Sequence, residues 1–447
     1  MKKTLYVALC LVLGMMLTTP AGASHFGDTF GFSPKGMSLG NAMTAKVDDW
    51  SAVYYNIAGL GRSRHLVNGK SQLFLGYISN APNFDIDIAR YDSTSGDPLA
   101  TSGDKALDTG TFVIGGVLDT GTLVNLPEIV SSARLGLAIG LNDDQSVVKI
   151  NDLDPRTHDF MRYGRECQRM LITTGMGFGF LNDTVGVGLG VNAYFTGDGI
   201  AALENVELQT ESQSPPGQAK MDLKMEQALT MGFYFSPGKI WRSLDTLDLG
   251  VAYRAESQLD ITPFRAVAST DLGGIPLNIA MALVDYYQPE MYSFGLAYTL
   301  NELTVSADVE IQKWSGFTFS DPMTANYAGE LKEFDDILIP KLGLAYACTP
   351  SLDLLFGYYY EPSFVPDEAV SGRMNFLDND KHVVSLGCTY QLPKVSMVKG
   401  NSEFSVGYQW QQMVDRDIVK AAPTPENPNY SYGGTCHSLM VGVSINI

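Results

Sequence analysis

The chain has 447 residues with 49 acidic and 30 basic side chains, and its formal net charge of −19 argues against a nucleic-acid partner. Only 18% of the residues are charged, whereas the 45 glycines and 22 tyrosines suit small lumen-facing positions and interfacial aromatic girdles. None of the five cysteines shows metal-ligand spacing, so we predict no metal site and no cofactor.

The first 23 residues are predicted to be a secretory signal peptide. Lys2 and Lys3 precede an apolar run over residues 5–17, and residues 20–23 form a small-residue cleavage site. Cleavage after Ala23 removes both lysines and changes the formal charge from −19 to −21. No later segment approaches about 18 uninterrupted apolar residues, which excludes a helical membrane protein on hydropathy. An exported chain rich in amphipathic strands is then expected to form a closed barrel, because lipid cannot satisfy an open sheet edge.

Residues 24–65 do not alternate and are predicted to form a hatch that plugs the barrel lumen. About eight strands fill their interior with their own side chains and about 16 leave a channel, so a barrel of intermediate size needs a plug. Phe26, Phe30 and Phe32 are candidates for lining an inner ligand site. Packing of the plug against the wall would use the same aromatic residues, and the sequence leaves both interpretations open.

Residues 66–447 are predicted to form the barrel wall, and residues 292–312 show the pattern most clearly. Apolar and polar side chains alternate on both sides of a tight turn at residues 301–302, which is the two-residue period of half-buried strands. The polar face holds carboxylates beside glycine and alanine, which suits a watery interior and leaves the apolar face for lipid. The 14 expected strands lie near residues 67–78, 111–118, 133–142, 168–180, 184–195, 221–235, 246–257, 291–300, 303–315, 337–347, 352–360, 382–391, 403–413 and 435–447.

The connections between these strands alternate between short and long. Residues 181–183, 301–302 and 348–351 are short connections, whereas intervening ones such as 196–220 and 258–290 are long and polar. Outer-membrane barrels have short periplasmic turns and long extracellular loops, so the alternation predicts a periplasmic C-terminus. We expect a monomer in the outer membrane of a Gram-negative bacterium, surrounded by membrane lipid and lipopolysaccharide.

Several short motifs resemble one known family. They are Gly36-x-x-x-Gly40-Asn41-Ala42, Asp48-Asp49, Asn56-Ile57-Ala58-Gly59-Leu60, Gly250-Val251-Ala252-Tyr253-Arg254, Ser306-Ala307-Asp308-Val309 with Trp314, and Phe356-Gly357-Tyr358 leading to Pro366-Asp367. From about Gly36 to its C-terminus, the chain resembles the long-chain fatty acid transporter (FadL) family of outer-membrane hydrophobic-compound transporters. The resemblance implies an all-β fold, a 14-stranded antiparallel transmembrane β-barrel with an N-terminal hatch plugging the lumen. It also implies that a long-chain fatty acid or other lipophilic small molecule is captured at extracellular loops and leaves sideways through a gap at the third strand.

Two groups of residues are expected at this exit. The resemblance implies that Asn56-Ile57-Ala58-Gly59 forms the hatch motif beside the gap, with Ile57 standing where the family usually has proline. Gly136 and Gly140 lie on the inward face of the third strand, where glycine permits a kink or bulge. The same glycines would also serve simply to give the hatch room. Lateral release is physically reasonable, because release of an alkyl chain into water would cost about 0.8 kcal/mol for each buried CH₂ group.

Five charged residues are expected to face the lumen from neighbouring strands. One interpretation is a charge network that helps to move ligand across the lumen, and the other is a solvated ladder that pins the hatch. The five residues are Arg254, Glu256, Asp308, Glu310 and Lys341.

Other functions and bonds are less well supported by the sequence. The five histidines are scattered without serine and carboxylate partners, so no catalytic residues are predicted and the chain is not expected to be an enzyme. A diffusion pore for small solutes, and a surface receptor or adhesin acting through long acidic loops, are the remaining alternatives. Cys348 and Cys388 are expected to be small wall residues, and a rim disulfide between Cys167 and Cys436 is a further hypothesis.

Overall fold

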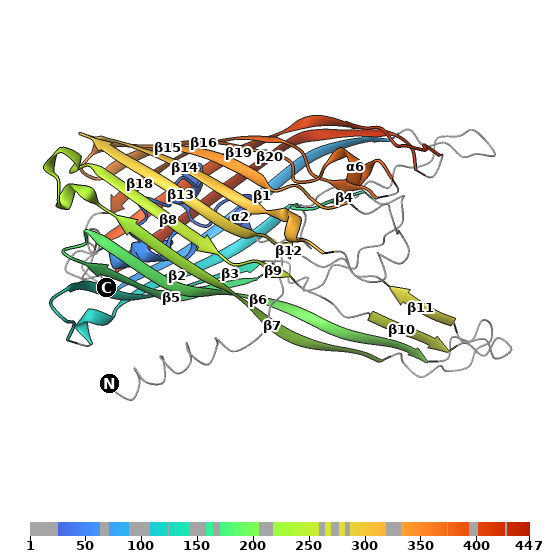
Figure 1. Ribbon diagram of the computed structural model, residues 1–447, viewed down its shortest axis with the longest axis horizontal. Helices are drawn as coiled ribbons and strands as arrows, with labels where there is room; N and C mark the ends of the chain where they lie inside the picture. Colours follow the sequence, from blue (N-terminus) through green and yellow to red (C-terminus); the bar gives the residue numbers. More distant parts are fainter. Residues whose placement is uncertain are drawn as a thin grey trace.

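Fourteen strands of the computed structural model close into one antiparallel barrel around a short helical plug (Figure 1). The first and last strands complete the ring through pairs that run from Gln72 with Asn446 to Ile88 with Tyr430. This closure confirms the predicted fold class. The structure describes residues 26–62, 71–88, 108–123, 125–142, 158–163, 170–204, 218–258, 264–269, 277–281, 287–318, 332–372, 374–392, 401–424 and 427–447. The predicted signal peptide lies outside these residues.

Each predicted strand has one counterpart in the structure. The ends differ by a few residues, and the largest differences are extensions, such as the first strand continuing to Ile88 and the fifth to Glu204. The barrel strands are β1 (Gln72–Ile88), β2 (Thr109–Asp119), β3 (Val130–Asn142), β5 (Leu171–Phe180), β6 (Val185–Glu204), β7 (Gln218–Phe235), β8 (Leu247–Arg254), β13 (Glu290–Leu300), β14 (Leu303–Lys313), β15 (Ile337–Thr349), β16 (Leu352–Glu361), β18 (Lys381–Leu392), β19 (Ser402–Ile418) and β20 (Tyr430–Asn446).

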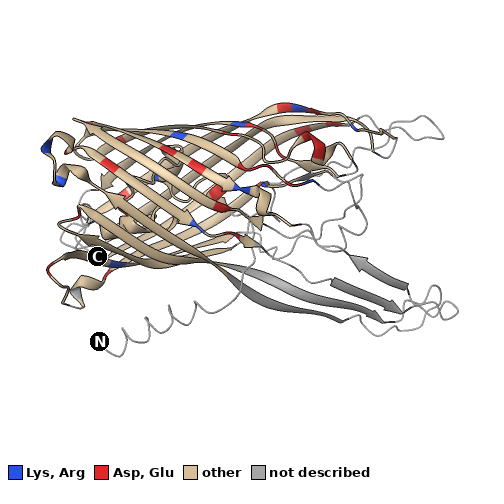
Figure 2. Cartoon of the chain, viewed as in Figure 1, with Lys and Arg blue, Asp and Glu red and all other residues tan. Residues whose placement is uncertain are grey.

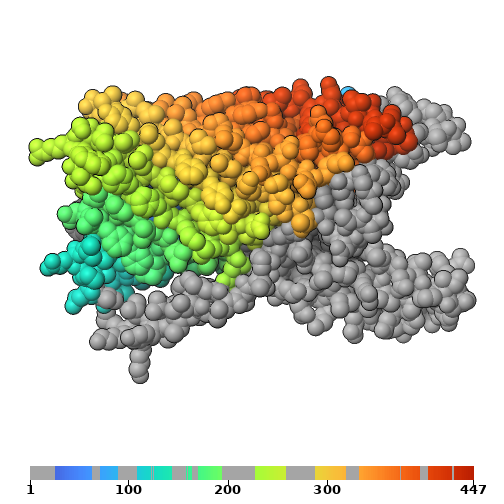
Figure 3. All heavy atoms as spheres, viewed as in Figure 1, coloured from blue at the N-terminus to red at the C-terminus, as the bar shows by residue number. Residues whose placement is uncertain are grey.

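The wall exposes apolar side chains on its outside and buries polar ones on its inside. On β13, Phe294 and Leu296 are 48% and 42% exposed, whereas Ala297 is fully buried. Asp308 on β14 faces inward and is buried. This arrangement is expected for strands that contact lipid. Figure 2 shows a wall that is mostly uncharged between its ends, and Figure 3 shows that the described wall is continuous from β7 and β8 to β20 on the face drawn.

The two ends of the barrel differ in the length of their connections. At the turn end, named here for its short connections, residues 181–183 have φ of 53°, 56° and 60°, and Asn301 has φ of 52°. These left-handed backbones reverse the chain within a few residues. At the opposite, long-loop end, β6 and β7 extend well beyond most other strands (Figure 1).

One predicted long loop contains short strands. In residues 258–290, β10 runs parallel to the extension of β6 and antiparallel to β11. The reason is that β6 continues past its last pairing with β5, so its backbone groups at that edge need other partners. The short strands are β9 (Ser257–Gln258), β10 (Phe264–Ser269), β11 (Leu277–Met281) and β12 (Tyr287–Gln288).

The hatch, described over residues 26–62, is built from short helical turns inside the barrel. Its elements are α2 (Phe26–Thr29), α3 (Pro34–Ser38), α4 (Ala52–Tyr55) and the 3₁₀ turn η1 (Ile57–Gly61). Ser33 caps α3 by accepting a hydrogen bond from Gly36, and Pro34 occupies its first turn, both favourable choices at a helix start. Among the described residues, no helix has the length and apolar character to cross a membrane.

Candidate functional site: the hatch and its two walls

Around Gly136 and Gly140, the hatch contacts β3 through apolar side chains. A Cβ atom added to Gly136 would lie 2.2 Å from Val53 Cγ1, and one added to Gly140 would lie 2.3 Å from Phe26 Cε1. Both distances are well below the ~3.5–4.0 Å of an ordinary carbon contact, so these positions require glycine while the hatch is in place. The geometry supports the interpretation that the two glycines give the hatch room.

β3 remains paired with both neighbouring strands at these glycines. Gly136 and Gly140 each have partners on β2 and on β5. The register of the β3–β5 ladder shifts between Val130 and Ser132, near the turn end. In the described residues, strand pairing is therefore not interrupted at Gly136 or Gly140, and any gap there requires a different conformation.

The three candidate phenylalanines lie inside the plug, and each is at most 2% exposed. Phe32 stacks on Tyr54 with ring centroids 4.4 Å apart and on Phe26 at 5.5 Å. Phe30 contacts Tyr163 edge-on at 6.0 Å. They form an aromatic cluster on the long-loop side of the hatch, so a ligand at this position would replace contacts between aromatic rings.

Hydrogen bonds hold the hatch to the wall formed by β7 and β8. The side-chain amide of Asn56 donates to the carbonyl oxygens of Thr44 at 2.7 Å and Phe233 at 3.0 Å. Arg62 pairs with Asp248 at 2.9 Å, and both side chains are almost fully buried. Ala58 and Gly59 continue the same motif in η1, where the Ala58 amide donates back to Asn56 at 3.2 Å.

The predicted charged residues differ in their partners. Asp308 accepts a hydrogen bond from the Thr44 amide at 2.8 Å and so anchors the hatch to β14. Glu256 accepts a hydrogen bond from the Tyr287 hydroxyl at 3.1 Å, away from the hatch. The remaining three residues flank one small cavity.

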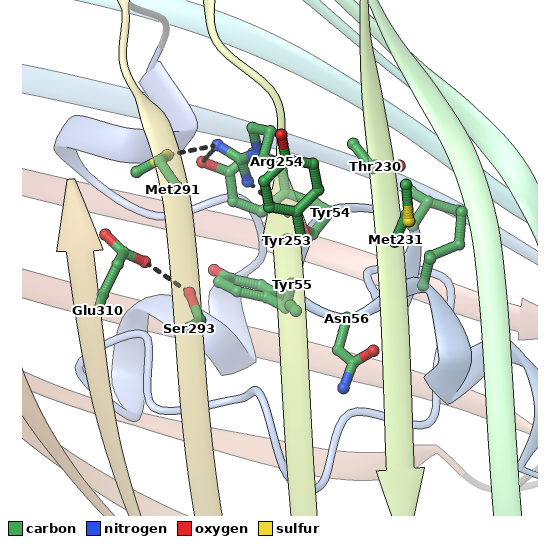
Figure 4. A pocket seen from close by; sticks show the side chains of 13 residues that line it. Tyr54, Tyr55, Asn56, Thr230, Met231, Tyr253, Arg254, Met291, Ser293 and Glu310 are labelled. Carbon is green, nitrogen blue, oxygen red and sulfur yellow. Dashed lines mark hydrogen bonds between the residues drawn. The ribbon is translucent and has the colours of Figure 1, made fainter. Parts of the chain in front are cut away.

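This cavity, called the chamber here, lies between two ion pairs. Arg254 on β8 pairs with Asp28 of the hatch at 2.7 Å, and Lys341 on β15 pairs with Glu310 on β14 at 2.8 Å. The chamber measures about 30 Å³ and is lined by all four charged groups, which gives room for ordered water. Figure 4 shows the adjoining pocket, where Arg254 lies beside Tyr54 and Glu310 is hydrogen-bonded to a serine.

A second layer of buried residues covers the long-loop end, and the sequence analysis did not identify it. This cap consists of residues 158–163, 314–318, 332–336, 361–372 and 374–380. The cap includes α6 (Asp367–Val370) and a short parallel pairing of β4 (Asp159–Phe160) with β17 (Phe376–Leu377). Its aromatic core is centred on Trp314 and Phe364, which stack with ring centroids 3.7 Å apart.

Four buried charges lie together in the cap and at the start of β18. Arg162 pairs with Glu361 and lies 3.8 Å from Asp378, while Lys381 at the start of β18 lies 3.4 Å from Glu361 and 3.7 Å from Asp378. All four side chains are at most 5% exposed. The sequence signal that could have revealed the cap is the presence of Trp314, Phe334, Phe364 and Phe376 in otherwise polar connections.

One of the two cysteines in the suggested rim disulfide is among the described residues. Cys436 is a buried free thiol in the structure, and its suggested partner Cys167 lies outside the described residues.

A further cavity lies at the turn end. It measures about 630 Å³ and is lined by polar side chains that include Lys35 and Asp48, which lie 3.7 Å apart.

Comparison with known proteins agrees with this architecture. A family model described as "Outer membrane protein transport protein (OMPP1/FadL/TodX)" matches residues 18–415. Alkane uptake protein A of Marinobacter nauticus is 23% identical over 445 residues, which cover 96% of this chain and 93% of that protein.

Solved structures show the same fold. A Pseudomonas aeruginosa FadL homologue superposes with a TM-score of 0.55 at 13% identity, covering 96% of this chain and 99% of the other. The Pseudomonas putida toluene transporter TodX gives a TM-score of 0.54 at 13% identity, with 94% and 99% covered. The match confirms the predicted family and outer-membrane location, and membership in a family of channels confirms that the chain is not an enzyme. This chain therefore belongs to the OMPP1/FadL/TodX family of outer-membrane proteins, which transport hydrophobic compounds.

Proposed function

We propose that this barrel takes up hydrophobic compounds with a long alkyl chain and releases them sideways into the membrane at β3. The observation that carries the proposal is the asymmetry of the hatch. Its contacts with β3 at Gly136 and Gly140 are apolar, whereas its contacts with β7, β8 and β14 are hydrogen bonds and ion pairs.

This asymmetry favours movement of the hatch away from β3. The contacts of Val53 and Phe26 with β3 would be replaced by equivalent contacts with an apolar cargo, at little net cost. The bonds of Asn56 and Arg62 to β7 and β8 have no such substitute, because each buried group left unsatisfied costs about 1–3 kcal/mol. An alkyl chain would therefore enter between the hatch and β3.

Polar contacts limit how far this movement extends. Near the turn end, Arg134 on β3 donates to the carbonyl oxygens of Leu60 and Arg62, and Ser132 donates to that of Gly61. On β5, Thr173 donates to the Val53 carbonyl at 3.1 Å. These bonds favour a local opening around Gly136 and Gly140 rather than ejection of the whole plug.

Lateral release follows from the energetics of the cargo. Each CH₂ group that stays out of water retains about 0.8 kcal/mol, so transfer from the barrel to the bilayer avoids a large barrier that periplasmic water would impose. In the described structure β3 is paired throughout this region, so release requires β3 to part from a neighbour while cargo is present.

Capture is assigned to the cap at the long-loop end, which we take to be extracellular. The stacked pair of Trp314 and Phe364 and the neighbouring Phe334 are buried in the aromatic core of the cap, so cargo would enter by replacing contacts between these rings. Tyr163 links the two layers, because it contacts both Phe30 of the hatch and Phe160 of the cap. We further propose that the barrel is a monomer whose apolar outer face contacts lipid and lipopolysaccharide.

A reversible disulfide between the hatch and β3, called a lock here, tests this route. In the variant Val53→Cys with Gly136→Cys, the smaller side chain at 53 frees space for a Cβ at 136, and a disulfide would fix the hatch to β3. Cells whose only route for a labelled long-chain compound is this barrel should lose uptake when the lock is oxidised and regain it after reduction. Undiminished uptake in the oxidised, fully cross-linked protein would overturn the proposed route.

The matched control places a lock on another wall. A Cβ at Gly407 on β19 would lie 2.8 Å from Ser38 Oγ and 2.6 Å from the Pro34 carbonyl oxygen, so Ser38→Cys with Gly407→Cys should join α3 to β19 after a small shift of α3. This lock leaves the contact with β3 free, and uptake should continue under oxidising conditions. Equal inhibition by both locks would mean that the hatch must leave as a whole.

A further inference from the structure

We infer that the passage selects uncharged cargo, so that a neutral alkyl compound is accepted and a long-chain carboxylate is rejected. The inference rests on the proposed route and names its substrate class. The observation behind it is that the buried cations of the cap and the chamber already have acceptors within the protein, most of them carboxylates.

The cap provides the first set. Arg162 and Lys381 share the two carboxylates of Glu361 and Asp378, so two positive and two negative charges are packed together almost without solvent contact. Arg162 is further enclosed by aromatic rings, with its guanidinium 4.7 Å from the centroid of Phe364. An arriving carboxylate would have to displace Glu361 or Asp378 and leave it buried without its cation.

The chamber contains the second set of paired charges, again two positive and two negative. Arg254 is paired with Asp28 and Lys341 with Glu310, and each pair has additional hydrogen bonds. Asp28 also accepts from the Tyr54 hydroxyl, and Glu310 accepts from Ser293 at 3.2 Å. Asp308 stands beside Lys341 in the β14–β15 ladder, so the balance of this region is neutral to negative.

Two further cations, one on β19 and one just after it, also have acceptors in the cap. Arg416 pairs with Asp367 at 2.6 Å, and Lys420 donates to the carbonyl oxygens of Val370 at 2.7 Å and Gly372 at 2.9 Å. Within the part of the chain that the structure describes, the six cations named here therefore all have acceptors in place. The formal charge of −19 for the whole chain adds general repulsion of anions.

The test compares two ligands that share a chain length and differ in charge. Hexadecanol and hexadecanoate, both radiolabelled, are offered to the detergent-purified full-length barrel at pH of about 8, where a free carboxylate is ionised. The wild-type protein should retain hexadecanol and bind hexadecanoate at least about tenfold more weakly, since the carboxylate meets no available cation.

Releasing one cation should abolish the preference. Glu310→Gln leaves Lys341 without its carboxylate, and Asp28→Asn does the same for Arg254. Either variant should bind hexadecanoate about tenfold more tightly than the wild type and change hexadecanol binding little. Two independent variants on opposite sides of the chamber protect the test against failure of one to fold, and heat-dependent mobility on SDS gels reports assembly.

The matched control removes a carboxylate at the turn end, at the other end of the barrel from the cap. Asp245 is exposed in the short connection between β7 and β8. Asp245→Asn removes one negative charge, as each chamber variant does, but removes it outside the cap and the chamber. It should leave the ratio of the two ligands unchanged.

The outcomes separate the inference from the proposed function. Equal binding of both ligands by the wild type, or unchanged hexadecanoate binding in both chamber variants, would overturn charge selection and leave alkyl uptake intact. Failure of the assembled wild type to retain either ligand would count against alkyl uptake itself, and against charge selection with it.

Discussion

Asn56 of the hatch and Phe233 of β7 are joined by a hydrogen bond of 3.0 Å from the side-chain amide to the backbone carbonyl oxygen. The same amide nitrogen donates to Thr44, and the Asn56 side-chain oxygen accepts from the Ala58 amide. One side chain thus fixes the start of η1, connects two hatch segments and ties both to β7. Asparagine suits this position because it provides two donors and one acceptor on a short, compact group.

Replacement of Asn56 by leucine should loosen the hatch without preventing barrel assembly. The change keeps a similar volume but leaves buried backbone groups of Thr44 and Ala58 without these partners, at about 1–3 kcal/mol for each group. Limited proteolysis should cut within residues 26–62 sooner than in the wild type, and SDS resistance should be lost at a lower temperature.

A second variant, Asn56→Asp, tests the two donated bonds. Aspartate keeps the oxygen that caps η1 but places a buried carboxylate oxygen against the carbonyl oxygens of Thr44 and Phe233, so it should loosen the hatch at least as much as Asn56→Leu. An unchanged cleavage pattern in Asn56→Leu would show that this side chain does not hold the hatch.

Replacement of Ile57 by proline should be tolerated. Ile57 is the first residue of η1, and Asn56 before it is extended with φ of −158° and ψ of 101°. Proline is favoured at the first helical position and favours an extended residue before it. Uptake and assembly should persist, with a net change in unfolding free energy within about 2 kcal/mol because lost packing is partly offset by a stiffer chain.

The side chain of Ile57 is tested separately. It is buried against Gly175 and Gly190, where an added Cβ would lie 2.3 Å from its Cδ1 atom. Ile57→Ala removes this contact without the ring and should destabilise the hatch by about 2–5 kcal/mol. If thermal unfolding in detergent places the proline variant below the alanine variant, the backbone argument is wrong.

The wall was predictable from the sequence because its signal is local. Phe294 and Leu296 are exposed to the outside and Ala297 faces in, as a two-residue period requires. Strand order also followed, since each strand pairs with the next one in the chain and the ring is closed by β1 and β20. The ends of the strands were less predictable, because extensions such as that of β6 depend on partners in the long connections.

The partners of inward-facing side chains could not be read from the same pattern. Alternation assigned Arg254 and Glu310 to the lumen, but their environment depends on Asp28 in the hatch and Lys341 on another strand. The cap shows the limit most clearly, since Arg162 and Glu361 are paired although 199 positions separate them in the chain. Such contacts follow from the folded arrangement and leave no local period in the sequence.

Sidedness can be tested with epitope tags. Gln218 is the first residue of β7 at the long-loop end, whereas Asn301 forms the turn between β13 and β14 at the turn end. A tag inserted at Gln218 should be labelled by antibody on intact cells, and a tag at Asn301 should be labelled only after the outer membrane is permeabilised. Labelling of Asn301 alone on intact cells would invert the topology.

The last prediction concerns the contact between Val53 and Gly136, which substitutions can break and restore. If β3 were kinked at Gly136 and Gly140, valine at both positions would straighten it and stop uptake. In the structure, β3 is already paired at both positions, and valine side chains there would meet Val53 and Phe26. The double variant should therefore displace the hatch, with overpacking of about 1–3 kcal/mol at each site. Single-channel conductance should rise, because a displaced plug leaves water in the lumen.

A milder pair of changes shows whether this contact is the cause. Gly136→Ala alone places a Cβ against Val53 Cγ1 and should destabilise the seated hatch, measured as earlier proteolysis and a lower temperature of SDS dissociation. Val53→Ala removes that methyl group, so the combined variant should be more stable than the sum of the two single changes predicts. A coupling of about 0.5–3 kcal/mol is expected for residues in direct contact. Strict additivity in this double-mutant cycle would show that Gly136 is required for a reason other than the space occupied by Val53, and the kink hypothesis for β3 would then regain its force.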